Sequence, residues 1–178
     1  MIQDSLVLFY SWSGNTQRVA QMIAEKTGAD LVELQPVAPY PRDYTMTVQR
    51  ARKEIREKIH PDIVPPQMDW SRYETVFLGT PNWCGTMAPP LAAFLYQTMP
   101  VDKNIVPFCT HGGGGAGSIA KDMAYYCIGC DVLPVLSLRN DGGAGAERQI
   151  DQWLQDVERR LEMLRLERRS DGGHHDET

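Results

Sequence analysis

Ser11-Trp12-Ser13-Gly14-Asn15-Thr16 follows the apolar run Leu6-Val7-Leu8-Phe9-Tyr10 and opens a helical pattern. A β-strand that leads through a hydroxyl- and glycine-rich turn into a helix can hold a phosphate, because the turn N–H groups and the helix N-terminus carry partial positive charge. The turn contains no Lys or Arg, so it is not a Walker A loop. Neutral donors suit a phosphomonoester that is held and not transferred. The alternative is an ordinary strand-to-helix turn with a good cap.

A second informative loop, Gly79-Thr80-Pro81-Asn82-Trp83-Cys84-Gly85-Thr86, follows the predicted strand at 75–79. Trp83 is a flat aromatic ring at a strand end and could stack on a flat ligand. Gly85 permits backbone conformations closed to other residues, which suits close approach or a peptide that reorients. The alternative is a Trp packed under a loop.

A third loop, Thr110-His111-Gly112-Gly113-Gly114-Gly115-Ala116-Gly117-Ser118, follows the predicted strand at 105–109. Its glycines let the backbone lie against a ring edge and offer N–H groups to it. The loop also satisfies the dinucleotide pattern G-x-G-x-x-G. A run of glycines satisfies that pattern easily by chance. No acidic residue is clearly placed after the next strand, so a dinucleotide site is disfavoured.

Strand and helix patterns alternate five times, which predicts a doubly wound α/β fold with a five-stranded parallel sheet. The expected strands are 5–10, 30–35, 75–79, 105–109 and 132–138, and the expected helices are 16–26, 43–60, 89–99, 118–127 and a last one reaching about 166. In the strand order 2-1-3-4-5 the three loops meet at the carboxyl ends of neighbouring strands, where ligands bind in such sheets. Pro107 is expected at an edge or a bulge, because it lacks a ladder donor.

These motifs resemble the flavodoxin-like family over residues 5–157. The first loop is similar to the FMN-phosphate loop [ST]-x-[ST]-G-x-T, and the second to the flavin loop G-x-P-x-W-x-G. The resemblance implies FMN as cofactor and a peptide, Cys84–Gly85, that reorients on flavin reduction. Many flavodoxins have a stacking aromatic in the third loop, where this chain has His111. The implied cofactor-binding residues are Ser11, Trp12, Ser13, Gly14, Asn15, Thr16, Pro81, Asn82, Trp83, Cys84, Gly85, Thr110, His111, Gly112 and Gly113.

The length of 178 residues predicts one domain, here 1–166, followed by a disordered charged tail at 167–178. A net charge of −5 without a basic stripe argues against nucleic acid as a partner. The chain shows no signal peptide and no apolar run long enough to span a membrane, so we expect a cytoplasmic protein.

Catalytic and metal-binding groups are not readable from the sequence. Cys127-Ile128-Gly129-Cys130 is a lone CxxC without a second ligand pair, and we interpret it as two reduced, mostly buried thiols. Tyr40 and Tyr44 could reach a flavin from the long 36–74 connection, although packing is the simpler role. The sequence assigns no residue to catalysis and none to a metal.

The preferred interpretation is an FMN-binding, flavodoxin-like electron carrier that meets redox partner proteins or a small quinone-like acceptor. The chain's acidity would suit basic partners. One alternative is an NAD(P)H-dependent FMN or quinone reductase, favoured by the missing third-loop aromatic. The other is a flavodoxin-like interaction module that does not bind flavin.

Overall fold

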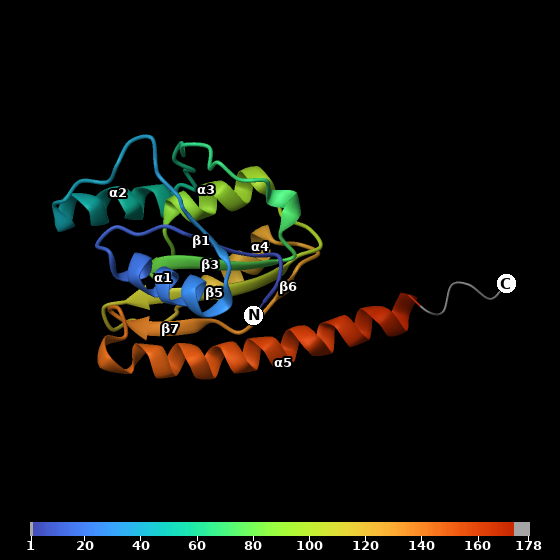
Figure 1. Ribbon diagram of the computed structural model, residues 1–178. Helices are drawn as coiled ribbons and strands as arrows, with labels where there is room; N and C mark the ends of the chain where they lie inside the picture. The colour runs from blue at the N-terminus through green and yellow to red at the C-terminus, as the bar shows by residue number, and fades with distance from the viewer. Residues whose placement is uncertain (1, 173–178) are drawn as a thin grey trace.

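A computed structural model of the chain describes residues 2–172, and its core is one twisted sheet between two layers of helices (Figure 1). The main strand order is β2-β1-β3-β5-β6, with β4 paired to β3 and β7 paired to β5. All pairings are parallel except that of β4 with β3. The strands are β1 (Ser5–Phe9), β2 (Asp30–Glu33), β3 (Thr75–Trp83), β4 (Thr86–Met87), β5 (Asn104–His111), β6 (Asp131–Val132) and β7 (Leu136–Arg139).

Helices α1 and α5 cover one face of the sheet, and α2, α3 and α4 lie over the other (Figure 1). Two short 3-10 helices, Trp70–Arg72 and Gly143–Gly145, complete the regular structure. The doubly wound α/β architecture predicted from the sequence is therefore confirmed. The helices are α1 (Asn15–Thr27), α2 (Tyr44–Arg56), α3 (Pro89–Thr98), α4 (Ile119–Tyr126) and α5 (Ala146–Gly172).

The central strands are apolar on both sides because each side faces a helical layer. Leu6 and Leu8 of β1 belong to the core cluster under α3 and α4, whereas Val7 and Phe9 belong to the cluster under α1 and α5. The five residues of β1 are all buried. A parallel strand covered on both faces reads as a continuous apolar run, and this is why the sequence predicts it well.

The predicted fifth strand, 132–138, is two short strands, β6 and β7, that both pair with β5. Pro134 lies in the interruption between them. The sheet thus keeps the predicted order, while its last position is filled by two pieces.

Pro107 lies in the interior strand β5, not at an edge or bulge, so that expectation is wrong. The Ile105 carbonyl oxygen accepts the N–H of Leu133 at 2.8 Å, and the His111 carbonyl oxygen accepts the N–H of Asn140 at 2.8 Å. Odd-numbered residues of β5 therefore face β6 and β7. Pro107 is one of them, and it lies opposite the interruption between these two strands, where no ladder bond needs its missing N–H.

Two predicted helix ends differ from the structure. Helix α2 ends at Arg56 and not near His60, and residue Lys58 has a positive φ of 52° just beyond it. Helix α5 continues to Gly172, so residues 167–172 are helical and not part of a disordered tail. The remainder of the predicted tail, 173–178, lies outside the described residues.

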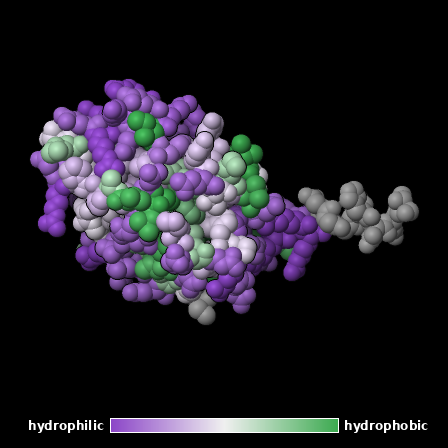
Figure 2. Space-filling view, turned by 90° about the horizontal axis from the view of Figure 1, so that it is seen from above, coloured by the Kyte–Doolittle hydropathy of each residue, from purple (hydrophilic) through white to green (hydrophobic). Residues whose placement is uncertain are grey.

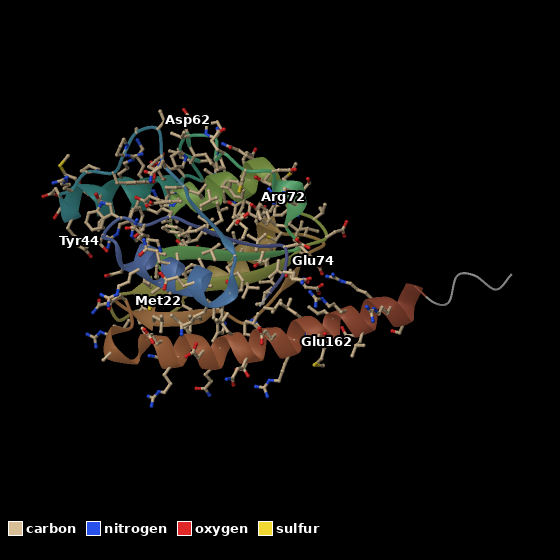
Figure 3. The ribbon with its side chains drawn as sticks, viewed as in Figure 1. Met22, Tyr44, Asp62, Arg72, Glu74 and Glu162 are labelled. Atoms are coloured by element: carbon tan, nitrogen blue, oxygen red, sulfur yellow. The ribbon has the colours of Figure 1, made fainter. Side chains whose placement is uncertain are left out.

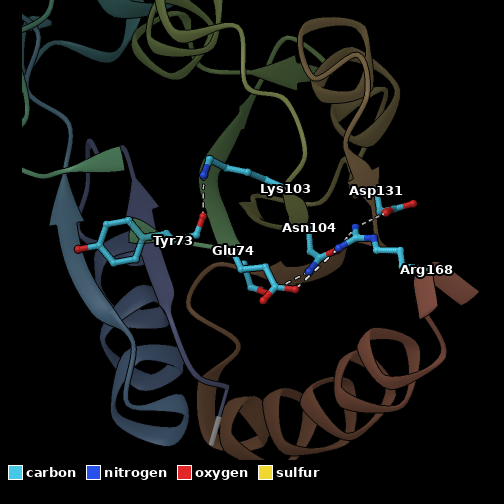
Figure 4. A network of polar contacts seen from close by, with 7 residues as sticks. Tyr73, Glu74, Lys103, Asn104, Asp131 and Arg168 are labelled. Atoms are coloured by element: carbon cyan, nitrogen blue, oxygen red, sulfur yellow. Dashed lines mark hydrogen bonds and ion pairs between the residues drawn. The ribbon is translucent and has the colours of Figure 1, made fainter. Parts of the chain in front are cut away.

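The amino ends of the strands are joined by a network of polar contacts around Arg168 of α5 (Figure 4). Arg168 donates to Asn104 Oδ1 at 3.0 Å and to Asp131 Oδ2 at 2.7 Å, and it lies 3.7 Å from a Glu74 carboxylate oxygen. Lys103 Nζ donates to the Tyr73 carbonyl oxygen at 2.6 Å. These contacts fix the starts of β3, β5 and β6 relative to α5.

Candidate functional site

The loop from β1 to α1 presents a row of backbone N–H groups. The Ser11 hydroxyl accepts the N–H groups of Gly14 and Gln17, each at 3.2 Å, and Gly14 caps the helix with a φ of 95°. Five further N–H groups make no hydrogen bond to any described residue: those of Ser11, Trp12, Ser13, Asn15 and Thr16. Such a group of free donors at a helix N-terminus binds anions.

Thr16 and Thr110 join the first loop to the third. Their hydroxyl oxygens are 2.8 Å apart and both side chains are buried. The Thr16 hydroxyl therefore bonds within the protein, while its backbone N–H remains free. The hydroxyl pair joins the start of α1 to the end of β5 at the carboxyl edge of the sheet.

The second loop is a tight hairpin, which the sequence did not predict. Strand β3 continues to Trp83, and Trp83 pairs with Thr86 of β4 across two residues with positive φ, Cys84 at 56° and Gly85 at 84°. Two such residues define a type I′ turn, the connection that matches the twist of antiparallel strands. Cys84 adopts this conformation despite its side chain, and that is why a loop was expected instead.

The hairpin tip is held from both sides. The Gly85 N–H donates to Asn82 Oδ1 at 2.9 Å, and the Gly85 carbonyl oxygen accepts the N–H of Ser118 at 2.8 Å. Asn82 Nδ2 donates to the Gly115 carbonyl oxygen at 2.6 Å. A Cβ on Gly117 would lie 2.3 Å from the Gly85 oxygen, so this contact between hairpin and third loop requires glycine at 117.

His111 shapes the third loop through its own ring. Its Nδ1 accepts the Gly113 N–H at 3.0 Å. A neutral ring must then carry its hydrogen on Nε2, since Nδ1 is occupied as an acceptor. His111 lines the cavity described below and supplies no second large aromatic wall.

Trp83 belongs to a cluster of perpendicular aromatic rings. Its centroid lies 4.9 Å from that of Tyr40, 5.5 Å from that of Tyr10 and 6.4 Å from that of Trp12. Burial raises the pKa of Tyr10 and Tyr40, so both hydroxyls stay protonated at physiological pH. Tyr40 therefore packs behind Trp83, in the role expected for it.

The three loops surround a cavity of about 360 Å³ at the carboxyl ends of β1, β3 and β5. Figure 3 shows Tyr44, which also lines it, at the start of α2 and at the same end of the molecule as these loops. The predicted site residues that line the cavity are Trp12, Ser13, Asn15, Pro81, Asn82, Trp83, Cys84, Thr110, His111 and Gly112.

The other predicted site residues lie around the cavity and do not line it: Ser11, Gly14, Thr16, Gly85 and Gly113. Sequence reasoning missed a wall contributed by α2 and one residue after β7, namely Thr47, Val48, Ala51, Arg52 and Asn140. The apolar face of α2 was visible in the sequence, but nothing in its spacing indicated that part of it borders a ligand.

The CxxC lies away from this cavity. Cys127 is buried and Cys130 is half-buried, and both thiols are free. Burial raises the pKa of the Cys127 thiol to about 12. Within residues 2–172 no cluster of three or more His, Cys, Asp or Glu side chains could hold a metal ion.

The sheet is doubly wound, and at its carboxyl edge a first loop suited to anions borders an aromatic cavity. This combination is typical of α/β proteins that bind a nucleotide-like cofactor. The family model for flavodoxins matches residues 4–157, so the chain belongs to the flavodoxin family. Flavodoxins are FMN proteins, and the family assignment thereby confirms the cofactor predicted from the three loops.

Solved structures support the assignment. A Lactobacillus acidophilus flavoprotein crystallised in complex with FMN has a TM-score of 0.70 and 24% identity, covering 85% of this chain and 99% of its own. A candidate flavoprotein from Bacteroides eggerthii has a TM-score of 0.75 and 26% identity, covering 86% and 97%. An archaeal flavodoxin matches with a TM-score of 0.53 and 16% identity, covering 89% and 99%. No curated protein matches the chain.

The residues present fit FMN. The free N–H groups of the first loop suit a phosphate, and the cavity volume of about 360 Å³ lies within the usual range for small ligands. Trp12 and Trp83 supply aromatic surface for a flat ring system. Separately, within the described chain none of the helices has both the length and the apolar content that crossing a bilayer requires.

Proposed function

We propose that this protein transfers electrons through FMN bound at the carboxyl edge of the sheet. The observation that carries the proposal is the row of free N–H groups between Ser11 and Thr16 beside an aromatic cavity. The N–H groups hold the phosphate, and the cavity holds the flavin ring. FMN supplies the redox chemistry, and the protein supplies binding, orientation and electrostatics.

The hairpin residues would position the backbone next to the flavin. The Gly85 N–H donates to Asn82 Oδ1, and the Gly85 carbonyl oxygen accepts the N–H of Ser118. Rotation of the Cys84–Gly85 peptide would therefore break the bond to Asn82. Trp12 and Trp83 exclude water from the cavity wall, and His111 can donate from Nε2.

The direct test is reconstitution of the purified full-length chain with FMN, followed by stepwise reduction with dithionite. A carrier shows flavin absorbance bands and a build-up of one-electron-reduced flavin before full reduction. Riboflavin, which lacks the phosphate, binds much more weakly than FMN. Equal affinity for the two ligands contradicts the phosphate assignment, and failure to bind FMN leaves the flavin-free interaction module.

A second candidate is an NAD(P)H-dependent FMN or quinone reductase. The observation that favours it is His111, since the third-loop wall has no large aromatic ring and leaves room for a substrate. Rapid oxidation of NADH or NADPH by the FMN-loaded protein with a quinone, without one-electron-reduced flavin, supports this function over the carrier.

The partners and the location of the protein stay predictions. A redox partner protein or a small quinone-like acceptor suits either function. The cytoplasmic location rests on the sequence alone.

A further inference from the structure

A second cavity, of about 540 Å³, lies beside the flavin cavity. Its lining comes from the end of α2 and the turn after it, from β4, and from α3 and α4. The hairpin separates the two cavities, because Trp83 and Cys84 line one and Thr86 and Met87 line the other. Figure 2 looks onto this helical face, where hydrophobic patches interrupt a mostly hydrophilic surface.

Aromatic rings form the walls of this second cavity. The His60 and Tyr96 rings are stacked, with centroids 4.3 Å apart and planes 17° from parallel, and Tyr126 meets His60 edge-on at 6.0 Å. Tyr96 and Tyr125 are 58% and 72% exposed, so their rings are available to a ligand. Burial lowers the pKa of His60, so its ring is neutral at pH 7. The exposed Tyr96 and Tyr125 rings suit a planar aromatic ligand.

The two carboxylates in the lining already have donors. Asp122 Oδ2 accepts from Thr86 Oγ1 and Ser118 Oγ, each at 2.5 Å. The buried Glu54 carboxylate accepts from Arg50 Nε at 2.9 Å and from the Tyr40 hydroxyl. Arg50 balances the charge of Glu54, whereas Asp122 keeps its negative charge against two neutral hydroxyl donors.

Lys58 is the cation that remains. Its side chain is exposed, lines the cavity and makes no ion pair or hydrogen bond with another described residue. The hydroxyl groups of the lining tyrosines are neutral and can either donate or accept a hydrogen bond. Lys58 is thus the charged donor that the described lining leaves for a ligand, and it suits a negative charge.

We propose that this cavity binds a planar aromatic ligand that carries a carboxylate or a phosphate. The aromatic part lies against the exposed Tyr96 and Tyr125 rings, and the anionic group lies at Lys58. The proposal is independent of flavin binding, since the cavity is lined by other residues. The test of this cavity therefore has the same meaning whether or not the protein transfers electrons.

The test uses amide chemical shifts of the full-length, FMN-loaded protein, titrated with two matched pairs of probes. AMP is compared with adenosine, and benzoate with benzyl alcohol. We expect the charged member of at least one pair to bind at millimolar or lower concentration, with shifts around His60, Tyr96 and Tyr125 and without release of FMN. AMP binding identifies a nucleotide phosphate, and benzoate binding an aromatic carboxylate.

Two variants localise the site. Lys58→Gln weakens binding of the anionic probe about tenfold and leaves its uncharged partner unaffected, whereas Lys121→Gln, on the same helical face but outside the cavity, has no effect. Tyr125→Ala, at an exposed position, weakens both members of the pair. The proposal is overturned if charged and uncharged probes bind equally, if binding displaces FMN, if Lys58→Gln has no effect, or if neither anion binds at millimolar concentration.

Discussion

The two ends of the sheet differ in whether their polar groups are paired within the protein. At the amino end, Arg168 contacts Glu74, Asn104 and Asp131, and so ties the starts of β3, β5 and β6 to α5. At the carboxyl end, five N–H groups of the first loop have no acceptor within the described chain. A polar group that the protein leaves unpaired needs water or a ligand. The amino end is therefore built for stability and the carboxyl end for binding.

The largest expected effect comes from placing a negative charge among the free N–H groups. Ser13→Asp should weaken FMN binding by about 100-fold or more, because the carboxylate competes with the phosphate for the free N–H groups and repels it. Riboflavin affinity changes little. Isothermal titration with both ligands measures this, and Ser170→Asp, at an exposed position on α5, serves as the control. A similar loss for riboflavin shows that the loop does not hold the phosphate.

The contact between the hairpin and the third loop gives the next effect. Gly117→Ala places a Cβ against the Gly85 oxygen, 2.3 Å away, whereas Gly129 also has a positive φ but has open space around it. Gly117→Ala should lower the free energy of unfolding by about 1–3 kcal/mol more than Gly129→Ala does. Urea denaturation of both variants measures the difference. Equal values mean that the close contact is not needed.

The Arg168 contacts at the amino ends of the strands can be removed without changing the candidate site at the carboxyl ends. Arg168→Ala should lower the free energy of unfolding by roughly 1 kcal/mol, since its side chain is 45% exposed and water screens the ion pairs. FMN affinity should not change. Chemical denaturation and FMN titration together check this. A loss of FMN affinity contradicts the separation of the two ends.

The smallest effect is a pH dependence from His60. Burial lowers its pKa in the folded protein below the ordinary value, so the unfolded chain binds the proton more readily. Stability is full above the unfolded pKa of about 6.5 and falls as the pH drops below it. His60→Phe keeps a ring against Tyr96 and should flatten the loss of stability between pH 7 and pH 5. Thermal denaturation at both values measures it, and an unchanged slope assigns the effect to other groups.

The amount that the sequence predicts differs between the sheet and the site. Strands such as 5–9 are readable because burial on both faces leaves a continuous apolar run. The hairpin is not readable, because Cys84 adopts a positive φ that its residue type disfavours. Pro134 indicated that the last strand could be interrupted. The sequence did not show that Pro107 of the neighbouring strand lies opposite this interruption.

Contacts between distant segments account for the rest. The hydroxyl bond between Thr16 and Thr110 and the contact between Arg168 and Asn104 join residues 94 and 64 positions apart. No spacing rule along the chain reports such pairs. The wall that α2 contributes to the proposed flavin cavity also depends on how the helix packs against the sheet and not on its own sequence pattern.

The hairpin turn also places a chemical handle at the binding site. Of the four cysteines, Cys84 is the exposed one, while Cys109 and Cys127 are buried and Cys130 is half-buried. A maleimide dye should therefore react first at Cys84, which lines the proposed flavin cavity. Fluorescence from that single label would follow ligand arrival and partner docking in real time, without introducing any new residue into the chain.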